Sequence, residues 1–143
     1  MARHASSGPA PGFQREPNYS IELRPATVRV RGMVAGSPVV DSGDALVLFE
    51  AGLSPVWYFP QADIRMDLLT RTGSATHCPF KGDASYWTLS TPAGPRADAA
   101  WAYEAPFDEM AALAGRLAFY WDALDQWCED GIERRDSPSL PSA

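Results

Sequence analysis

The chain is organised around one stretch of sequence, Thr76-His77-Cys78-Pro79-Phe80-Lys81-Gly82-Asp83-Ala84-Ser85-Tyr86-Trp87. These residues bring together an imidazole, a thiol, an ammonium, a carboxylate, a hydroxyl, a phenol and an indole. Pro79 and Gly82 favour a turn, so we predict a turn with polar side chains that enters a strand at Ala84. We interpret this turn as the rim of a pocket.

Short segments with strand-like patterns lie on both sides of this turn. Residues 27–31 alternate with period two, as a half-buried strand does. Ala35-Gly36 and Asp130-Gly131 are typical of tight hairpin turns. Helices do not alternate regularly with strands, so a parallel doubly wound sheet is disfavoured. The predicted strands are 27–31, 39–40, 45–50, 56–59, 85–90, 96–103, 117–120 and 124–128.

Two segments predict short helices. Residues 60–69 begin with proline and space Ile64 and Leu68 four apart, and residues 106–115 gather apolar side chains on one face before Gly115. Strands and helices together predict a mainly β fold. We expect a single compact domain of antiparallel sheets, as an open barrel or two packed sheets, with the two helices covering an end.

The length of 143 residues gives room for one domain and one core. Residues 1–18 are rich in Ala, Ser, Gly and Pro and lack an apolar period, so we predict a disordered N-terminal tail. Residues 19–135 are the predicted β domain, and residues 136–143 are a second predicted tail. His4 is expected to be solvated in the first tail.

Charge and cysteine content exclude several classes of function. The formal net charge is −6, and no run of Lys or Arg offsets it, so we expect no nucleic-acid partner. No apolar window is long enough to span a bilayer, so we expect no membrane partner and a cytoplasmic protein. Cys78 and Cys128 form no CxxC pair, which predicts neither a disulfide framework nor a metal site. No cofactor is expected.

Eight short motifs occur in order along roughly residues 20–134. They are Val28-Arg29-Val30, Val40-Asp41-Ser42, Tyr58-Phe59-Pro60, Asp63-Ile64-Arg65-Met66-Asp67-Leu68-Leu69, Thr76-His77-Cys78-Pro79-Phe80-Lys81-Gly82, Ala84-Ser85-Tyr86-Trp87, Ala100-Trp101-Ala102-Tyr103 and Leu117-Ala118-Phe119-Tyr120. Together they resemble the bacterial and fungal family catalogued as domain of unknown function 427. The run from His77 to Gly82 is the most specific part of the resemblance.

The resemblance implies a small tent-like β domain, in which curved antiparallel sheets lean together and leave a cleft. Some domains of that architecture hold zinc through paired CxxC motifs, which this sequence lacks. The family has also carried a nucleotidyltransferase-like label. The sequence has neither a glycine-rich phosphate loop nor paired aspartates with metal spacing, so that label gains no support. Fold alone does not set function.

Lys81 is the first candidate for a functional role, because it is the only lysine in the chain and lies in the specific motif. In a turn it could orient an anionic group or, if partly buried, act as an acid or base. The alternative is a solvated turn lysine.

His77 and Cys78 are adjacent, so in an extended segment their side chains point to opposite faces and cannot form a catalytic dyad. We expect Cys78 in the core as a small hydrophobe. His77 would then face the cleft as a general acid or base, or it would only hydrogen-bond backbone. A Ser85-His77-Asp83 hydrolase triad lacks the surrounding nucleophile elbow and is not favoured. Asp83 otherwise suits a turn hydrogen bond.

Arg65 could clamp a carboxylate if its helix borders the cleft, although a solvated charged face is the alternative. Aromatic side chains should divide between the core and the cleft. The expected binding residues are Arg65, Trp87, Trp101, Tyr103, Tyr120 and Asp83.

These residues predict a domain that binds a small organic molecule. If it is an enzyme, we expect cofactor-independent acid/base chemistry, such as isomerisation, cyclisation or hydrolysis, with Lys81, His77 and Tyr86 as catalytic residues. Two other classes stay open: a ligand-sensing module without catalysis, and a protein-interaction domain with a tryptophan-rich surface, for which a homodimer is one form.

Overall fold

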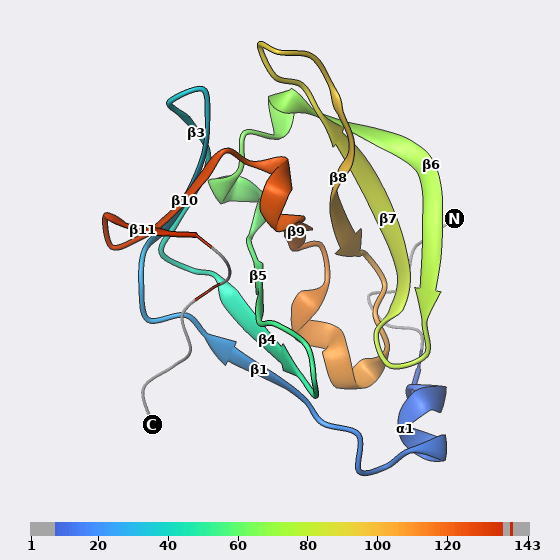
Figure 1. Ribbon diagram of the computed structural model, residues 1–143. Helices are drawn as coiled ribbons and strands as arrows, with labels where there is room; N and C mark the ends of the chain where they lie inside the picture. The colour runs from blue at the N-terminus through green and yellow to red at the C-terminus, as the bar shows by residue number, and fades with distance from the viewer. Residues whose placement is uncertain (1–7, 136–137, 139–143) are drawn as a thin grey trace.

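The computed structural model describes residues 8–135 and Pro138. In this part the chain forms eleven strands, one short α-helix and four 3₁₀ helices (Figure 1). Its strands pair antiparallel in three sheets, which do not close into a barrel. The predicted mainly β domain of antiparallel sheets is therefore confirmed.

Sheet A joins β1 (Ile21–Pro25), β4 (Leu46–Glu50) and β5 (Val56–Tyr58), with β4 in the centre. Alternation along β4 sends Leu48 and Glu50 to one face and Val47 to the other. The Glu50 carboxylate therefore lies on the same face of sheet A as the apolar side chain of Leu48.

Sheet B has the order β11 (Ile132–Arg134), β10 (Gln126–Glu129), β2 (Val30–Val34) and β3 (Ser37–Ser42). Its two hairpins turn at the predicted dipeptides. Ala35 and Gly36 have φ of 51° and 79°, and Asp130 and Gly131 have φ of 49° and 83°. Positive φ at both central residues matches the right-handed strand twist, which explains why these dipeptides predicted hairpins.

Sheet C has the order β6 (Leu69–Cys78), β7 (Gly82–Leu89), β8 (Arg96–Tyr103) and β9 (Leu117–Phe119). β6 is absent from the predicted strands, because this edge strand is mostly exposed and its sequence shows no clear apolar alternation. The turn predicted in the central stretch is confined to residues 79–81. Two backbone hydrogen bonds, from Phe59 N to Leu117 O (2.8 Å) and from Leu117 N to Phe59 O (3.0 Å), join sheet A to sheet C.

Buried side chains form two clusters on opposite faces of sheets A and C. The first cluster packs sheet B against Trp57 of β5 and Trp87 of β7. The second lies between the other faces of sheets A and C, with Tyr58 opposite Ala84 and Tyr103. Sheets A and C therefore contribute side chains to both clusters, and the second cluster borders the region between these two sheets.

The two predicted helices are 3₁₀ turns. Residues 60–69 contain η1 (Gln61–Asp63) and η2 (Met66–Leu68), and the segment before Gly115 contains η3 (Asp108–Leu113). The remaining 3₁₀ helix is η4 (Trp121–Ala123). Segments this short cannot sustain α-helix without packing, so local turns result. Gly115 has φ of 75° and ends η3, as its position predicted.

Residues 8–18 do not behave as the predicted tail. They contain α1 (Pro11–Arg15), whose Gly12 N donates to Pro79 O (2.9 Å), while Ala10 N donates to Glu109 Oε1 (2.9 Å). Figure 1 shows α1 beside the end of the β6–β7 hairpin. We call residues 8–20 the N-terminal strap. Residues 1–7, with His4, and residues 136, 137 and 139–143 lie outside the described residues.

Candidate functional site

Lys81 lies in the β6–β7 turn with its side chain buried. Its Nζ is 2.6 Å from Glu50 Oε1, and the two side chains are only 11% and 10% exposed. Its backbone carbonyl accepts from Phe107 N (3.0 Å). The next residue, Gly82, has φ of 125°, and a Cβ there would be 3.3 Å from Pro106 Cα. Only glycine suits this conformation, so the turn holds Lys81 toward sheet A.

Glu50 ends β4 and receives two donors. Oε1 accepts from Lys81, and Oε2 accepts from the Tyr19 hydroxyl (2.6 Å). The hydrogen bond to this carboxylate, with burial and its negative charge, raises the pKa of Tyr19 to about 12, because the phenolate would face an anion. Lys81, Glu50 and Tyr19 thus form one connected polar group.

The N-terminal strap fixes the turn that carries Lys81. Phe80 stacks on Tyr19, with ring centroids 4.2 Å apart, and meets Phe13 edge-on at 4.9 Å. Gly12 packs so closely that a Cβ there would be 2.7 Å from Phe80 Cδ1. The strap therefore holds both the turn and, through Tyr19, the Glu50 carboxylate.

Aromatic rings form the wall of a cavity of about 240 Å³ between sheets A and C. Trp101 Nε1 donates to the Tyr58 hydroxyl (3.2 Å), and Lys81 Nζ lies 6.0 Å from the centre of the Tyr103 ring. Burial raises the pKa values of Tyr58 and Tyr103, so both phenols stay neutral. The lining residues are Leu48, Glu50, Leu53, Ser54, Val56, Tyr58, Lys81, Tyr86, Trp101, Tyr103 and Tyr120.

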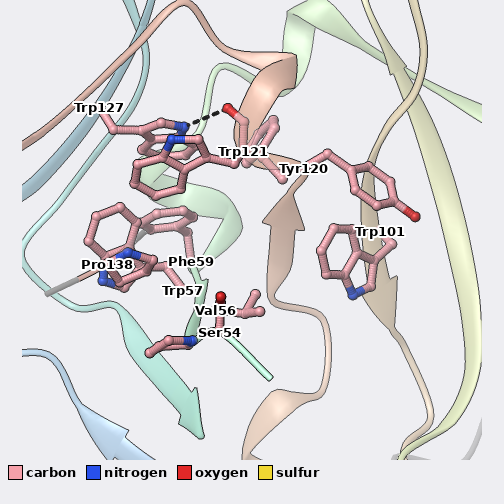
Figure 2. A pocket seen from close by; sticks show the side chains of 11 residues that line it. Ser54, Val56, Trp57, Phe59, Trp101, Tyr120, Trp121, Trp127 and Pro138 are labelled. Carbon is pink, nitrogen blue, oxygen red and sulfur yellow. Dashed lines mark hydrogen bonds between the residues drawn. The ribbon is translucent and has the colours of Figure 1, made fainter. Parts of the chain in front are cut away.

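A second cavity of about 210 Å³ adjoins the first and shares Ser54, Val56, Trp101 and Tyr120 with it. Figure 2 shows that its other walls are almost entirely aromatic or aliphatic. The remaining lining residues are Pro55, Trp57, Phe59, Phe119, Trp121, Trp127 and Pro138. A polar cavity at Lys81 thus lies next to an apolar one, and Trp101 and Tyr120 border both.

Five of the predicted site residues line the cleft together: Lys81, Tyr86, Trp101, Tyr103 and Tyr120. The Tyr86 hydroxyl is 2.9 Å from Thr76 Oγ1 across the β6–β7 pair. Burial, followed by the neighbouring Tyr86 phenol, raises the pKa of Tyr120. The sequence-based grouping of these aromatic residues with Lys81 therefore matches the geometry.

His77 and Asp83 are not in the cleft, which corrects the expectation for both. His77 Nδ1 is 2.7 Å from Asp83 Oδ1, and these side chains are 57% and 85% exposed. The two residues pair directly across β6 and β7. Alternation places their neighbours Cys78 and Ala84 on the side of the second cluster instead. Cys78 thus packs inward as predicted, while His77 faces solvent.

Ser85 and Trp87 share the face opposite the cleft. The Ser85 hydroxyl donates to Glu104 Oε1 (2.9 Å) and accepts from Arg71 (2.8 Å), so it is engaged away from His77. Trp87 is buried in the first cluster with the Arg71 guanidinium 5.5 Å from its ring centre. Trp87 is therefore a core residue rather than a cleft residue.

Arg65 is also remote from the cleft. Its guanidinium binds both oxygens of Asp67 at 2.9 and 2.8 Å, and both side chains are exposed. This pairing lowers the pKa of Asp67. Arg65 thus lies on a solvated charged face, which was the alternative to a role as a carboxylate clamp in the cleft.

Sequence reasoning missed Glu50, Tyr58 and Tyr19. Glu50 carried a usable signal, because it follows Leu46 and Leu48 at period two and therefore points where they point. Tyr19 carried none, since its role depends on the strap returning to β4. Among the described residues, no three His, Cys, Asp or Glu side chains are placed to hold a metal ion. The expectation of no cofactor stays a prediction.

The fold and cleft define a small antiparallel β domain with a cavity of about 240 Å³ between two sheets. The family model NTP_transf_9, described as Domain of unknown function (DUF427), matches residues 22–130, so the chain belongs to that family. No curated protein matches the chain. In the described part of the chain, no helix has the length and apolar character needed to cross a membrane.

Proposed function

We propose that the cleft between sheets A and C binds a small organic molecule and that the Lys81–Glu50 pair is its polar anchor. The observation that carries this proposal is a nearly buried ion pair at 2.6 Å that lines an aromatic cavity. A cavity lined by aromatic rings with a few convergent polar groups is the usual form of a ligand site.

The pair also has a cost that stability alone explains poorly. Desolvating two charges can cancel their mutual attraction, and apolar replacements of buried ion pairs are often neutral or stabilising. A charged pair beside a cavity is therefore better explained by a ligand than by folding. Its position in the only motif that contains a lysine supports the same proposal.

The chemistry that we propose is proton transfer without a cofactor. Glu50 would take a proton from the ligand on a lone pair that Lys81 and Tyr19 leave open, because each carboxylate oxygen can accept more than one hydrogen bond. The Lys81 ammonium would donate a hydrogen bond to the oxygen on which negative charge develops. Return of the proton to another position completes an isomerisation or a cyclisation. Tyr86, which lines the same cavity, would orient the ligand.

A non-catalytic sensing module would use the same cleft, so consumption of ligand separates the two functions. A protein-interaction surface has less support, because Trp57, Trp87 and Trp127 are buried. A homodimer remains a proposal that size-exclusion chromatography tests.

A cytoplasmic location is supported by the free thiols of Cys78 and Cys128. The proposed bacterial setting rests on the family resemblance.

The test is a thermal-shift and NMR screen of small organic compounds against the full chain. Cleft binders should shift the indole resonance of Trp101 and be lost in the Lys81→Met/Glu50→Leu double variant, which removes both charges together. Arg24→Met/Glu22→Leu is the matched control, since that pair is 50% and 53% exposed. No saturable binder, or equal binding by the cleft variant, would contradict the proposal.

A further inference from the structure

We infer that the ligand of this cleft is an uncharged, planar aromatic compound whose hydrogen-bond acceptor meets Lys81. This inference rests on the proposed function and narrows it to a chemical class. It follows from the charge, the available donors and the shape of the cavity.

The cleft carries no net charge. Among the described residues that line it, Lys81 and Glu50 are the charged ones, and they are paired at 2.6 Å. Burial keeps the Tyr58 and Tyr103 phenols neutral. A charged ligand would lose its hydration without an opposite charge to compensate it, which costs several kcal/mol. An uncharged ligand avoids this cost.

The polar end of the cleft offers the unused N–H groups of the Lys81 ammonium as hydrogen-bond donors. The Lys81 ammonium has three N–H groups, and Glu50 Oε1 takes one of them. Both Glu50 oxygens already accept, one from Lys81 and one from Tyr19. A carbonyl or hydroxyl oxygen of the ligand is therefore the group that this end recognises.

The walls favour a flat ring system. Trp101 meets Tyr58 at an interplanar angle of 89° and lies 4.7 Å from the Tyr120 ring centre, so several ring faces border the space. A cavity of about 150 Å³ holds benzene, whereas this one has about 240 Å³. A bicyclic aromatic compound matches this volume.

The experiment compares 2-naphthamide with 2-naphthoate, which differ mainly in charge at neutral pH, by calorimetric titration of the full chain. We expect the amide to bind about tenfold more tightly than the carboxylate. The affinity of the amide should also change less than twofold between about 0.02 and 0.5 M salt, because no net charge is involved.

The Glu50→Gln variant should reverse the preference between the two probes. It leaves Lys81 charged and unpaired, so this variant should prefer the carboxylate, while Glu22→Gln on an exposed pair should keep the wild-type order. Tighter binding of 2-naphthoate by the wild type overturns the inference, as does a failure of both probes to bind. In either case, a cleft ligand from the wider screen leaves the proposed function standing. If Glu50→Gln does not fold, the wild-type affinity order and salt response decide.

Discussion

Glu50 determines how Lys81 is interpreted. Without it, the only lysine of the chain is a solvated turn residue or a lone catalytic cation. With it, Lys81 forms a buried ion pair with one oxygen of the Glu50 carboxylate, and the other oxygen accepts a hydrogen bond from Tyr19. The ion pair also changes what a substitution should do, because removing one partner leaves the other charge buried.

Lys81→Met should lower the free energy of unfolding by about 3 kcal/mol, because Glu50 would lose its partner in a site that is largely shielded from water. The Lys81→Met/Glu50→Leu double variant should recover most of that loss. Urea unfolding of the two single variants and the double variant measures the coupling. Additive losses in the double variant would show that the two charges do not depend on each other.

The raised pKa of Tyr19 predicts that the stability of the fold decreases at high pH. Its pKa is about 12 in the folded protein, against an ordinary 10.0, mainly because its hydroxyl donates to Glu50. A raised pKa stabilises the fold fully below pH 10, and this stabilisation is lost as the pH rises through 12. Urea midpoints of the wild type should therefore fall more steeply over this range than those of Tyr19→Phe.

Tyr58 and Tyr103 also have raised pKa values. Both residues are present in the wild type and in Tyr19→Phe, so their effect on stability at high pH cancels when the two proteins are compared. Parallel pH profiles for the wild type and Tyr19→Phe would contradict the assigned hydrogen bond.

Among the elements, the N-terminal strap is the one whose role depends most on a distant segment. Its composition predicts a tail, yet Gly12 contacts the Pro79 carbonyl and the Phe80 ring. Because a buried glycine leaves no pattern in the sequence, the docking of α1 is visible only in the fold.

Gly12→Val should detach the strap, since a Cβ would lie 2.7 Å from Phe80 Cδ1. Trypsin cleavage after Arg15, the exposed last residue of α1, should become at least severalfold faster. Gln14→Val is the control, because Gln14 is exposed on the same helix. Equal cleavage rates in the wild type and Gly12→Val would show that the strap is not held there.

At the scale of the molecule, the two clusters of buried side chains depend on the same strands. β4 gives Val47 to one cluster and Leu48 to the other, and β8 gives Ala100 and Tyr103 in the same way. Because the two clusters share these strands, loss of packing in one cluster should disrupt the other. The domain should therefore unfold in one step.

This prediction is checked in a Cys128→Ser variant, where Cys78 is the remaining thiol. Tryptophan fluorescence reports mainly the first cluster, which contains Trp57, Trp87 and Trp127, whereas Trp101 packs against the second. Thiol labelling of Cys78 reports the second cluster alone. The two urea transitions should coincide, and a separation between them would mean that the clusters unfold independently.

The sequence by itself determined the β class, the hairpins at Ala35-Gly36 and Asp130-Gly131, and Lys81 as the central candidate. These features depend on local preferences, namely period-two alternation, positive φ at turns and the rarity of lysine in this chain. Tyr86, Trp101, Tyr103 and Tyr120, which the sequence predicted beside Lys81, line the same cavity as Lys81, and their role as site residues stays a prediction.

Only the tertiary structure decided which side chains share the cleft. It moved His77 and Asp83 to the outer face of sheet C, placed Trp87 in the core, and brought Glu50 from another sheet to Lys81. The physical reason is that strand order and register between distant segments set the face of each side chain, and local sequence does not encode them.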